Sequence, residues 1–119
     1  AKLAGAQLAN RKRDGRNIWP VWSPRNAKSP HKHFAYYHTN KLQAVRDHRW
    51  KLFLGETPKL YDLKADLAEQ YNVAEKHPAI IQRLEAAAKR IKKELGHQDS
   101  RGTHVRPVGR ADQPTARIK

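Results

Sequence analysis

The apolar residues of this chain are confined to one stretch, and this limits what the chain can fold into. Most aliphatic and aromatic residues lie within 34–95, whereas the flanks are rich in Arg, Lys, Gly, Pro and Asn. A core is therefore built from about 60 residues, a size at which an isolated domain is marginally stable. We expect a connecting segment over 1–33, a folded unit over 34–96 and a basic, disordered tail over 97–119.

The first half of the folded unit has the composition of β-strands separated by turns. The expected strands are 34–37, 42–46, 50–54 and 59–63. In the third of them Trp50, Leu52 and Leu54 share one face, and Lys51 and Phe53 share the other. The pattern predicts an antiparallel meander of three or four strands.

The second half predicts one long helix. Pro78 suits the first helical position, where its missing N–H is not needed, and Gly96 is typical of a helix end. Apolar residues at spacings of three and four form a single stripe of Ile81, Leu84, Ala88, Ile91 and Leu95. The expected fold class is α+β, a small antiparallel sheet of three to four strands with this helix packed on one face.

The net charge indicates attraction to polyanions. Lys and Arg total 25 against 11 Asp and Glu, which gives +14. Nucleic acid, anionic lipid and sulfated or phosphorylated substrates all fit such a charge, and binding of polyanions is expected to be non-specific. Basic residues flank Trp19, Trp22 and the paired tyrosines Tyr36 and Tyr37, which is the mixture that stacks single strands. The expected helix is a second candidate reader of nucleic acid, through Arg83, Lys89, Arg90, Lys92 and Lys93. The alternative is that they form the solvated face of an amphipathic helix.

The residue types that the chain lacks exclude some classes of protein. The chain has no Cys, which excludes disulfides and thiol catalysis. No apolar run reaches the roughly 20 residues needed to span a bilayer. Because no Met occurs, even at position 1, we expect a chain cut from a longer product.

No convincing catalytic set is visible. His31, His33 and His38 form the densest histidine cluster, but no carboxylate lies nearby to complete a set of metal ligands. Asp62 and Asp66 are four residues apart, as paired carboxylates can be, and the spacing equally suits turn and cap residues. The sequence favours the latter, and we expect no catalytic residue and no metal site in this chain.

A short apolar cluster precedes the expected sheet. It consists of Ile18, Trp19, Val21 and Trp22, and it has no evident partner within the chain. Exposed apolar patches of this kind usually mark interfaces. The cluster therefore predicts a surface that another domain covers, or that makes the isolated chain self-associate.

Taken in order, the segments resemble the C-terminal end of the sulfatase family. Residues 14–20 (DGRNIWP) are similar to the family's DG-x-[ND/S]-[IL]-x-P stretch. Residues 34–37 (FAYY), 42–46 (LQAVR) and 50–52 (WKL) resemble a hairpin that recurs in the family, with the pattern F-x-Y-Y, then L-x-AVR, then WKL. Residues 60–74, with LYDL, Asp66, Glu69 and NVA, resemble LYDL-x-x-DP-x-E-x-x-NLA before a helix that starts at His77-Pro78. Leu67 departs from the usual Pro, at a position that only forms a turn.

The resemblance implies a larger enzyme that hydrolyses a sulfate ester. The family's nucleophile is a formylglycine made in a [CS]-x-P-x-R motif, and its metal is calcium held by an Asp cluster. Neither has a match here, so both are expected in a missing N-terminal domain, which would be this chain's partner. The parent enzyme would be periplasmic or secreted. This chain would cap the catalytic domain and be inactive alone.

The same resemblance implies a place beside the mouth of the active site. One end of the first hairpin would then touch the sulfated substrate, with Tyr37, His38 and Arg46 as candidate substrate-binding residues. A tyrosine offers a ring and a hydroxyl to a sugar or aryl group, and His38 and Arg46 can donate to an anionic substituent. Because neighbours in a strand face opposite ways, one tyrosine must point into the core. We assign Tyr37 to the rim.

Overall fold

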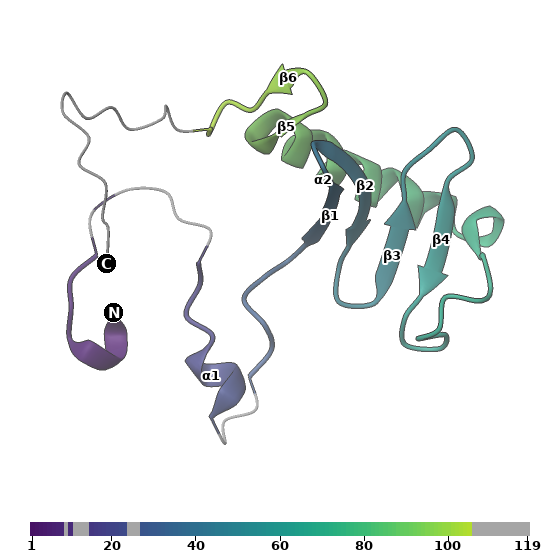
Figure 1. Ribbon diagram of the computed structural model, residues 1–119. Coiled ribbons are helices and arrows are strands. Elements are labelled where there is room, and N and C mark those ends of the chain that lie inside the picture. Colours follow the sequence, from purple (N-terminus) through teal and green to yellow (C-terminus); the bar gives the residue numbers. More distant parts are fainter. Residues whose placement is uncertain (9, 11–14, 24–26, 106–119) are drawn as a thin grey trace, which may run out of the picture.

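The folded unit is an antiparallel sheet with one long helix across a single face (Figure 1). The computed structural model describes residues 1–8, 10, 15–23 and 27–105. Four strands, in spatial order β1-β2-β3-β4, follow one another along the chain as an antiparallel meander. They span β1 Phe34–His38, β2 Lys41–Arg46, β3 Trp50–Phe53 and β4 Lys59–Asp62. The predicted α+β class is confirmed.

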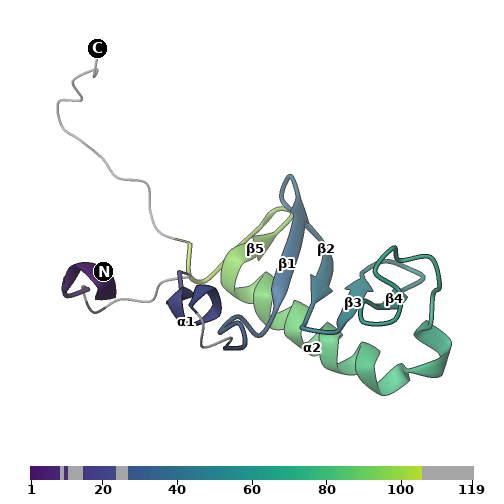
Figure 2. The same ribbon diagram turned by 90° about the horizontal axis from the view of Figure 1, so that it is seen from below.

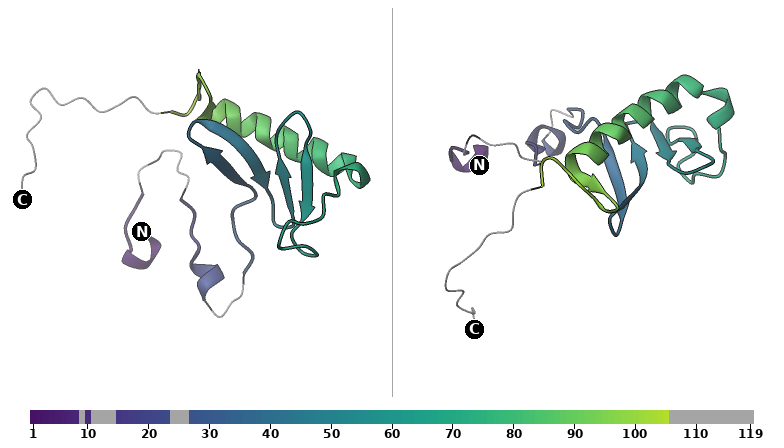
Figure 3. Two further views of the ribbon diagram at one scale, coloured as in Figure 1. Left: turned by 45° about the vertical axis from the view of Figure 1, so that its right-hand side comes forward. Right: turned by 90° about the horizontal axis from the view of Figure 1, so that it is seen from above.

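The helix α2, Pro78–Leu95, begins and ends where the sequence predicts. Pro78 occupies its first turn, and Gly96 ends it at φ 93°, a backbone conformation that glycine adopts without steric cost. Lys92 and Lys93 lie in the last turn, where cations stabilise the helix dipole. Figures 2 and 3 show α2 running obliquely across the strands, so that the other face of the sheet is free of helices.

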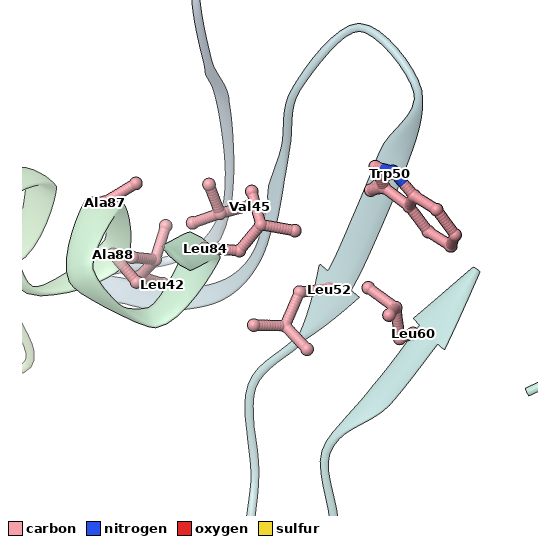
Figure 4. Packing of buried hydrophobic residues seen from close by; sticks show 8 residues of the cluster. All are labelled: Leu42, Val45, Trp50, Leu52, Leu60, Leu84, Ala87 and Ala88. Atoms are coloured by element: carbon pink, nitrogen blue, oxygen red, sulfur yellow. The ribbon is translucent and has the colours of Figure 1, made fainter. Parts of the chain in front are cut away.

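The core lies between α2 and the sheet. Leu52, Leu60 and Leu84 are fully buried, and Ala87 and Ala88 let the helix approach the strands closely. Figure 4 shows these side chains meeting between the two layers. The buried cluster consists of Leu42, Val45, Trp50, Leu52, Leu60, Leu84, Ala87 and Ala88. The predicted stripe of α2 is borne out at its centre, whereas Leu95 at its end is 49% exposed.

The opposite face of the sheet is covered by its own side chains. The Lys51 ammonium lies 4.7 Å from the ring centre of Tyr36 and 4.6 Å from that of Phe53. It also donates hydrogen bonds of 2.7 and 2.9 Å to the two carboxylate oxygens of Glu69. Phe53 packs edge-on against Tyr61. The Lys51 side chain thus covers part of the aromatic rings on this face of the sheet. The contact is stable because a cation over an aromatic ring is attracted to it.

The chain after the helix differs from the expected tail. Residues 96–101 form a hairpin of β5 Gly96–His97 and β6 Ser100–Arg101. Gln98 adopts φ 51° in its turn, and its N–H donates to the carbonyl of Asn40 in the β1–β2 turn. The expected tail thus begins later than the composition indicates, since hydrogen bonds to a distant turn order this polar segment. The remainder of the expected tail, 106–119, lies outside the described residues.

The apolar cluster before the sheet forms one helical turn, α1 Trp19–Trp22. The side chain of Asn17 accepts a hydrogen bond from the N–H of Trp19. Trp19 is 51% exposed and Trp22 76% exposed, and neither belongs to the hydrophobic core. Leu3 and Leu8 line a cavity together with Ile18, Trp19 and Trp22, and both indoles nevertheless stay largely exposed. Asp14, the first residue of the DGRNIWP segment, lies outside the described residues.

Candidate functional site

The end of the first hairpin lies against the β5–β6 hairpin. The Tyr37 hydroxyl donates a 2.7 Å hydrogen bond to the carbonyl oxygen of Gly96, and its ring packs against the core. Burial raises the pKa of the Tyr37 phenol. A cavity of about 470 Å³ lies beside this contact, lined also by Thr39 and His97. His97 accepts a hydrogen bond at Nδ1 from the N–H of Leu42, 3.0 Å away.

The expected rim residues do not form one cluster, because Tyr37 and His38 end β1 whereas Arg46 lies opposite the start of that strand. Tyr37 is the core-side tyrosine and Tyr36 faces outward, which corrects the assumed orientation. The physical reason is the period of two along β1, which places Ala35 and Tyr37 together on the helix face. His38 is exposed at the end of β1, whereas Arg46 pairs with Phe34 at the strand's other end.

A second and larger concavity lies between α2, the β2–β3 turn and the segment that enters β1. We name it the basic groove. Its volume is about 630 Å³, and its lining residues are Lys32, His33, Asp47, His48, Arg49, Trp50, Ile80, Arg83, Ala86, Ala87 and Arg90. Four of these are Lys or Arg and one is a carboxylate, so the groove is strongly positive.

Asp47 organises one wall of the basic groove. Its Oδ1 accepts hydrogen bonds from the backbone N–H groups of Arg49 (2.8 Å) and Trp50 (2.7 Å), which fixes the β2–β3 turn. Its Oδ2 accepts from the guanidinium of Arg83 at 2.5 Å. Both oxygens are therefore occupied, and Asp47 ties α2 to the sheet.

His33 lies half-buried in the same groove. Burial lowers the pKa of its imidazole, and the nearby cations Arg90, Arg83 and Lys32 lower it further, while Asp47 acts in the opposite direction. The groove thus favours a neutral imidazole in the absence of an anion.

Sequence reasoning did not identify the basic groove. It treated residues 47–49 as a turn and 31–33 as a candidate metal cluster. A usable signal existed in the helix, because Arg83 and Arg90 are seven residues apart and so share one face. What joins that face to Lys32 and His33 is the packing of α2 on the sheet, which no local pattern reveals.

The two carboxylates singled out in the sequence, Asp62 and Asp66, stabilise turns of the backbone, as does the amide of Asn72. Asp62 accepts from the N–H of Lys64 and forms a two-bond ion pair with Arg49, and Asp66 accepts from the N–H of Tyr71. The side-chain oxygen of Asn72 accepts from the N–H groups of Leu60 and Ala74. The turn interpretation of Asp62 and Asp66 is therefore confirmed, and Asn72 acts in the same way. Among the described residues, no three His, Asp or Glu side chains gather as a metal site would require.

Comparison with known proteins identified no family or relative. No protein-family model matches the sequence, and no curated protein shows significant similarity to it. Over the described ranges, no helix is both long enough and apolar enough to cross a membrane.

Proposed function

We propose that this chain is the C-terminal α+β subdomain of a sulfatase-like enzyme, which docks on a catalytic domain that carries the nucleophile and calcium. The observation that carries the proposal is the exposed apolar turn α1, which stands ahead of a folded unit with its own core. Trp22 is 76% exposed although it could bury a large ring. Burial of this apolar surface by a partner would lower the free energy of the protein in water.

The order of the elements supports the same proposal. The segments that resemble the family fall on α1, the first three strands, β4 and the start of α2, in the family's order. In the LYDL segment and the turns that follow it, the polar side chains accept hydrogen bonds from backbone N–H groups. This role suits a structural subdomain better than a catalytic centre. The substrate-rim role of Tyr37, His38 and Arg46 stays a prediction within this proposal.

The decisive test is the reading frame upstream of Ala1. We expect it to encode an α/β domain with a [CS]-x-P-x-R motif a few hundred residues before this chain. A start codon immediately before Ala1 would contradict the proposal. In addition, the purified chain assayed alone with an aryl sulfate and calcium is expected to show no turnover above a heat-treated control.

The docking surface can be tested in the chain itself. The isolated chain is expected to self-associate through α1, and Trp22→Ala should shift sedimentation towards the monomer. Tyr71→Ala is the matched control, since Tyr71 is 70% exposed but lies in the folded unit. Equal effects of the two changes, or a monomer whose Trp19 and Trp22 resist quencher, would argue against a docking role for α1.

The rim prediction is tested in the full-length parent. His38→Ala should raise KM for the natural substrate, because His38 is exposed and free to reach a ligand, without loss of folded protein. Unchanged KM and kcat would leave this turn as scaffold.

The alternative function, a freestanding basic module for nucleic acid or another polyanion, has one supporting observation in the basic groove. The paired tyrosines do not strengthen the nucleic-acid version. Tyr36 lies under Lys51 and beside Phe34, and Tyr37 is packed on the core. Neither ring offers the open face that base stacking needs.

A further inference from the structure

We propose that the basic groove is a binding site for a sulfate or phosphate ester group, held by Arg90, Lys32 and His33. The groove belongs wholly to this chain. The proposal is therefore independent of the proposed catalytic domain and of the proposed relation to sulfatases.

The charge of the groove is only partly compensated within the chain. Asp47 is committed to Arg83 and to two backbone N–H groups, as described above. Arg49 is paired with Asp62 at 2.6 Å. Among the described residues, Arg90 and Lys32 have no ion-pair partner, although both line the cavity that contains His33. Both cations disfavour a proton on His33, and an anion placed among the three side chains would offset that repulsion.

The groups that face this space are suited to an oxyanion. Lys and Arg side chains carry only donors, and an imidazole that gains a proton becomes a second donor. A tetrahedral ester has two or three terminal oxygens that share its negative charge, so it can accept from several such donors at once, and guanidinium binds it with a fork of two N–H groups.

The floor of the groove argues for the ester group rather than for a stacked base. Trp50 is only 8% exposed. One neighbour of its indole is the Arg49 guanidinium, 4.8 Å from the ring centre, and another is the His77 ring at 4.8 Å. The indole of Trp50 is therefore not open to a stacked nucleobase, whereas Ile80 and Ala87 give an apolar floor against which a sugar or aryl carrier can lie.

His33 supplies a direct reporter of binding. Its charged neighbours come from every side of the groove: Arg83 and Arg90 from α2, Lys32 from its own segment and Asp47 from the β2–β3 turn. Burial and the three cations hold the imidazole pKa down, so a bound anion should raise it. An ion that binds elsewhere on the surface would leave the His33 titration unchanged.

The experiment titrates the full chain with sodium sulfate and with sodium phosphate at constant ionic strength, with chloride as the reference ion. The His33 imidazole is followed by NMR across pH 5 to 8. We expect saturable shifts at His33 and an upward move of its pKa. Arg90→Ala should weaken binding roughly tenfold, since it removes a charge-assisted hydrogen bond.

Lys89→Ala is the matched control. Lys89 is the neighbour of Arg90 on α2 and loses the same charge, but it lines a different cavity beside Glu85 and Lys92. We expect it to change the affinity by less than twofold, because only screened, long-range attraction is lost. Arg90→Gln, which keeps most of the side-chain length, serves as a second variant if the alanine variant misfolds. Equal weakening by the Arg90 and Lys89 changes, or an unmoved His33, would overturn the proposal.

The source of the ester is decided by two further probes, a heparin-derived sulfated oligosaccharide and a single-stranded oligodeoxynucleotide. Both should be attracted by the net charge, with affinities that fall as salt rises. The difference between the Arg90 and Lys89 variants identifies the probe that enters the groove. A difference with the oligosaccharide alone assigns a sulfate ester, and one with the oligonucleotide alone assigns a phosphodiester. No difference with either, together with none for the two inorganic ions, would refute the site.

Discussion

The phenol of Tyr37 is hydrogen-bonded to the carbonyl of Gly96, 59 residues later in the chain, with an O···O distance of 2.7 Å. This contact joins the first strand to the end of α2. It holds the residues after the helix against the first strand and gives the carbonyl of the buried Gly96 a donor. The same tyrosine that the sequence assigns to a substrate rim is therefore a structural link.

Replacing Tyr37 by Phe should reduce the free energy of unfolding by about 1–2 kcal/mol, since the Gly96 carbonyl loses its donor. Because burial raises the folded-state pKa of Tyr37 above its ordinary 10.0, the folded state favours the neutral phenol. That contribution is complete below pH 10 and is lost as the pH rises through the folded-state pKa. Urea unfolding at pH 7 and pH 10.5 measures both effects. Tyr71→Phe, at an exposed ring, should leave stability unchanged, and an equal loss in both variants would contradict this account.

Gly102→Ala should destabilise the β5–β6 hairpin. A Cβ at this position would collide with the backbone of Leu95 and Gly96, which cannot move away as a flexible side chain could. We expect a loss of about 1–3 kcal/mol, as for overpacking elsewhere. The control is Gly55→Ala, because Gly55 has open space around its Cβ position. Thermal unfolding of the two variants checks the prediction, and a Gly102 variant as stable as the Gly55 variant would show that this packing is unimportant.

Leu84→Ala tests the contact between helix and sheet. Leu84 is fully buried at the centre of the core, so truncation removes apolar contacts and leaves a cavity. The expected loss is about 2–5 kcal/mol. Leu67→Ala, at a leucine that is 80% exposed, should stay within about 0.5 kcal/mol. Denaturant midpoints for both variants give the comparison, and a small loss at Leu84 would mean that α2 does not pack as described.

Lowering the pH should loosen the contact between His97 and Leu42. Burial lowers the pKa of His97 below its ordinary 6.5, and Lys92 and Lys41 lower it further. Only the deprotonated Nδ1 can accept the Leu42 N–H. The stabilisation is therefore complete above pH 6.5 and is lost as the pH falls through the folded-state value.

Hydrogen exchange at the Leu42 amide between pH 7.5 and pH 5, corrected for the intrinsic rate, measures this loosening directly. His97→Gln retains a side-chain acceptor that does not titrate in this range, so its Leu42 protection should be insensitive to pH. His31→Gln, at an exposed histidine, should behave as the unaltered chain does. Persistent protection of Leu42 at pH 5 in the unaltered chain would refute the role of His97.

Local patterns were sufficient for most of the fold. Alternation placed Trp50 and Leu52 on one face and Lys51 and Phe53 on the other, since successive side chains in a strand must point oppositely. Pro78 and Gly96 marked the ends of α2 because their backbone chemistry is suited to those positions. The exposure of Trp19 and Trp22 also agrees with the sequence, in which their cluster stands apart from the apolar stretch that forms the core.

The contacts between distant segments were decided by tertiary structure alone. Composition marked 97–119 as a tail, but the hydrogen bonds of Tyr37, Asn40 and Leu42 to residues 96–98 order its first part. The choice between Tyr36 and Tyr37 depended on which face of β1 received α2. The basic groove arises where Lys32, Asp47 and Arg90 meet, on three segments far apart in sequence. Burial, pKa and charge repulsion at such a place depend on distances through space, and a sequence pattern specifies only distances along the chain.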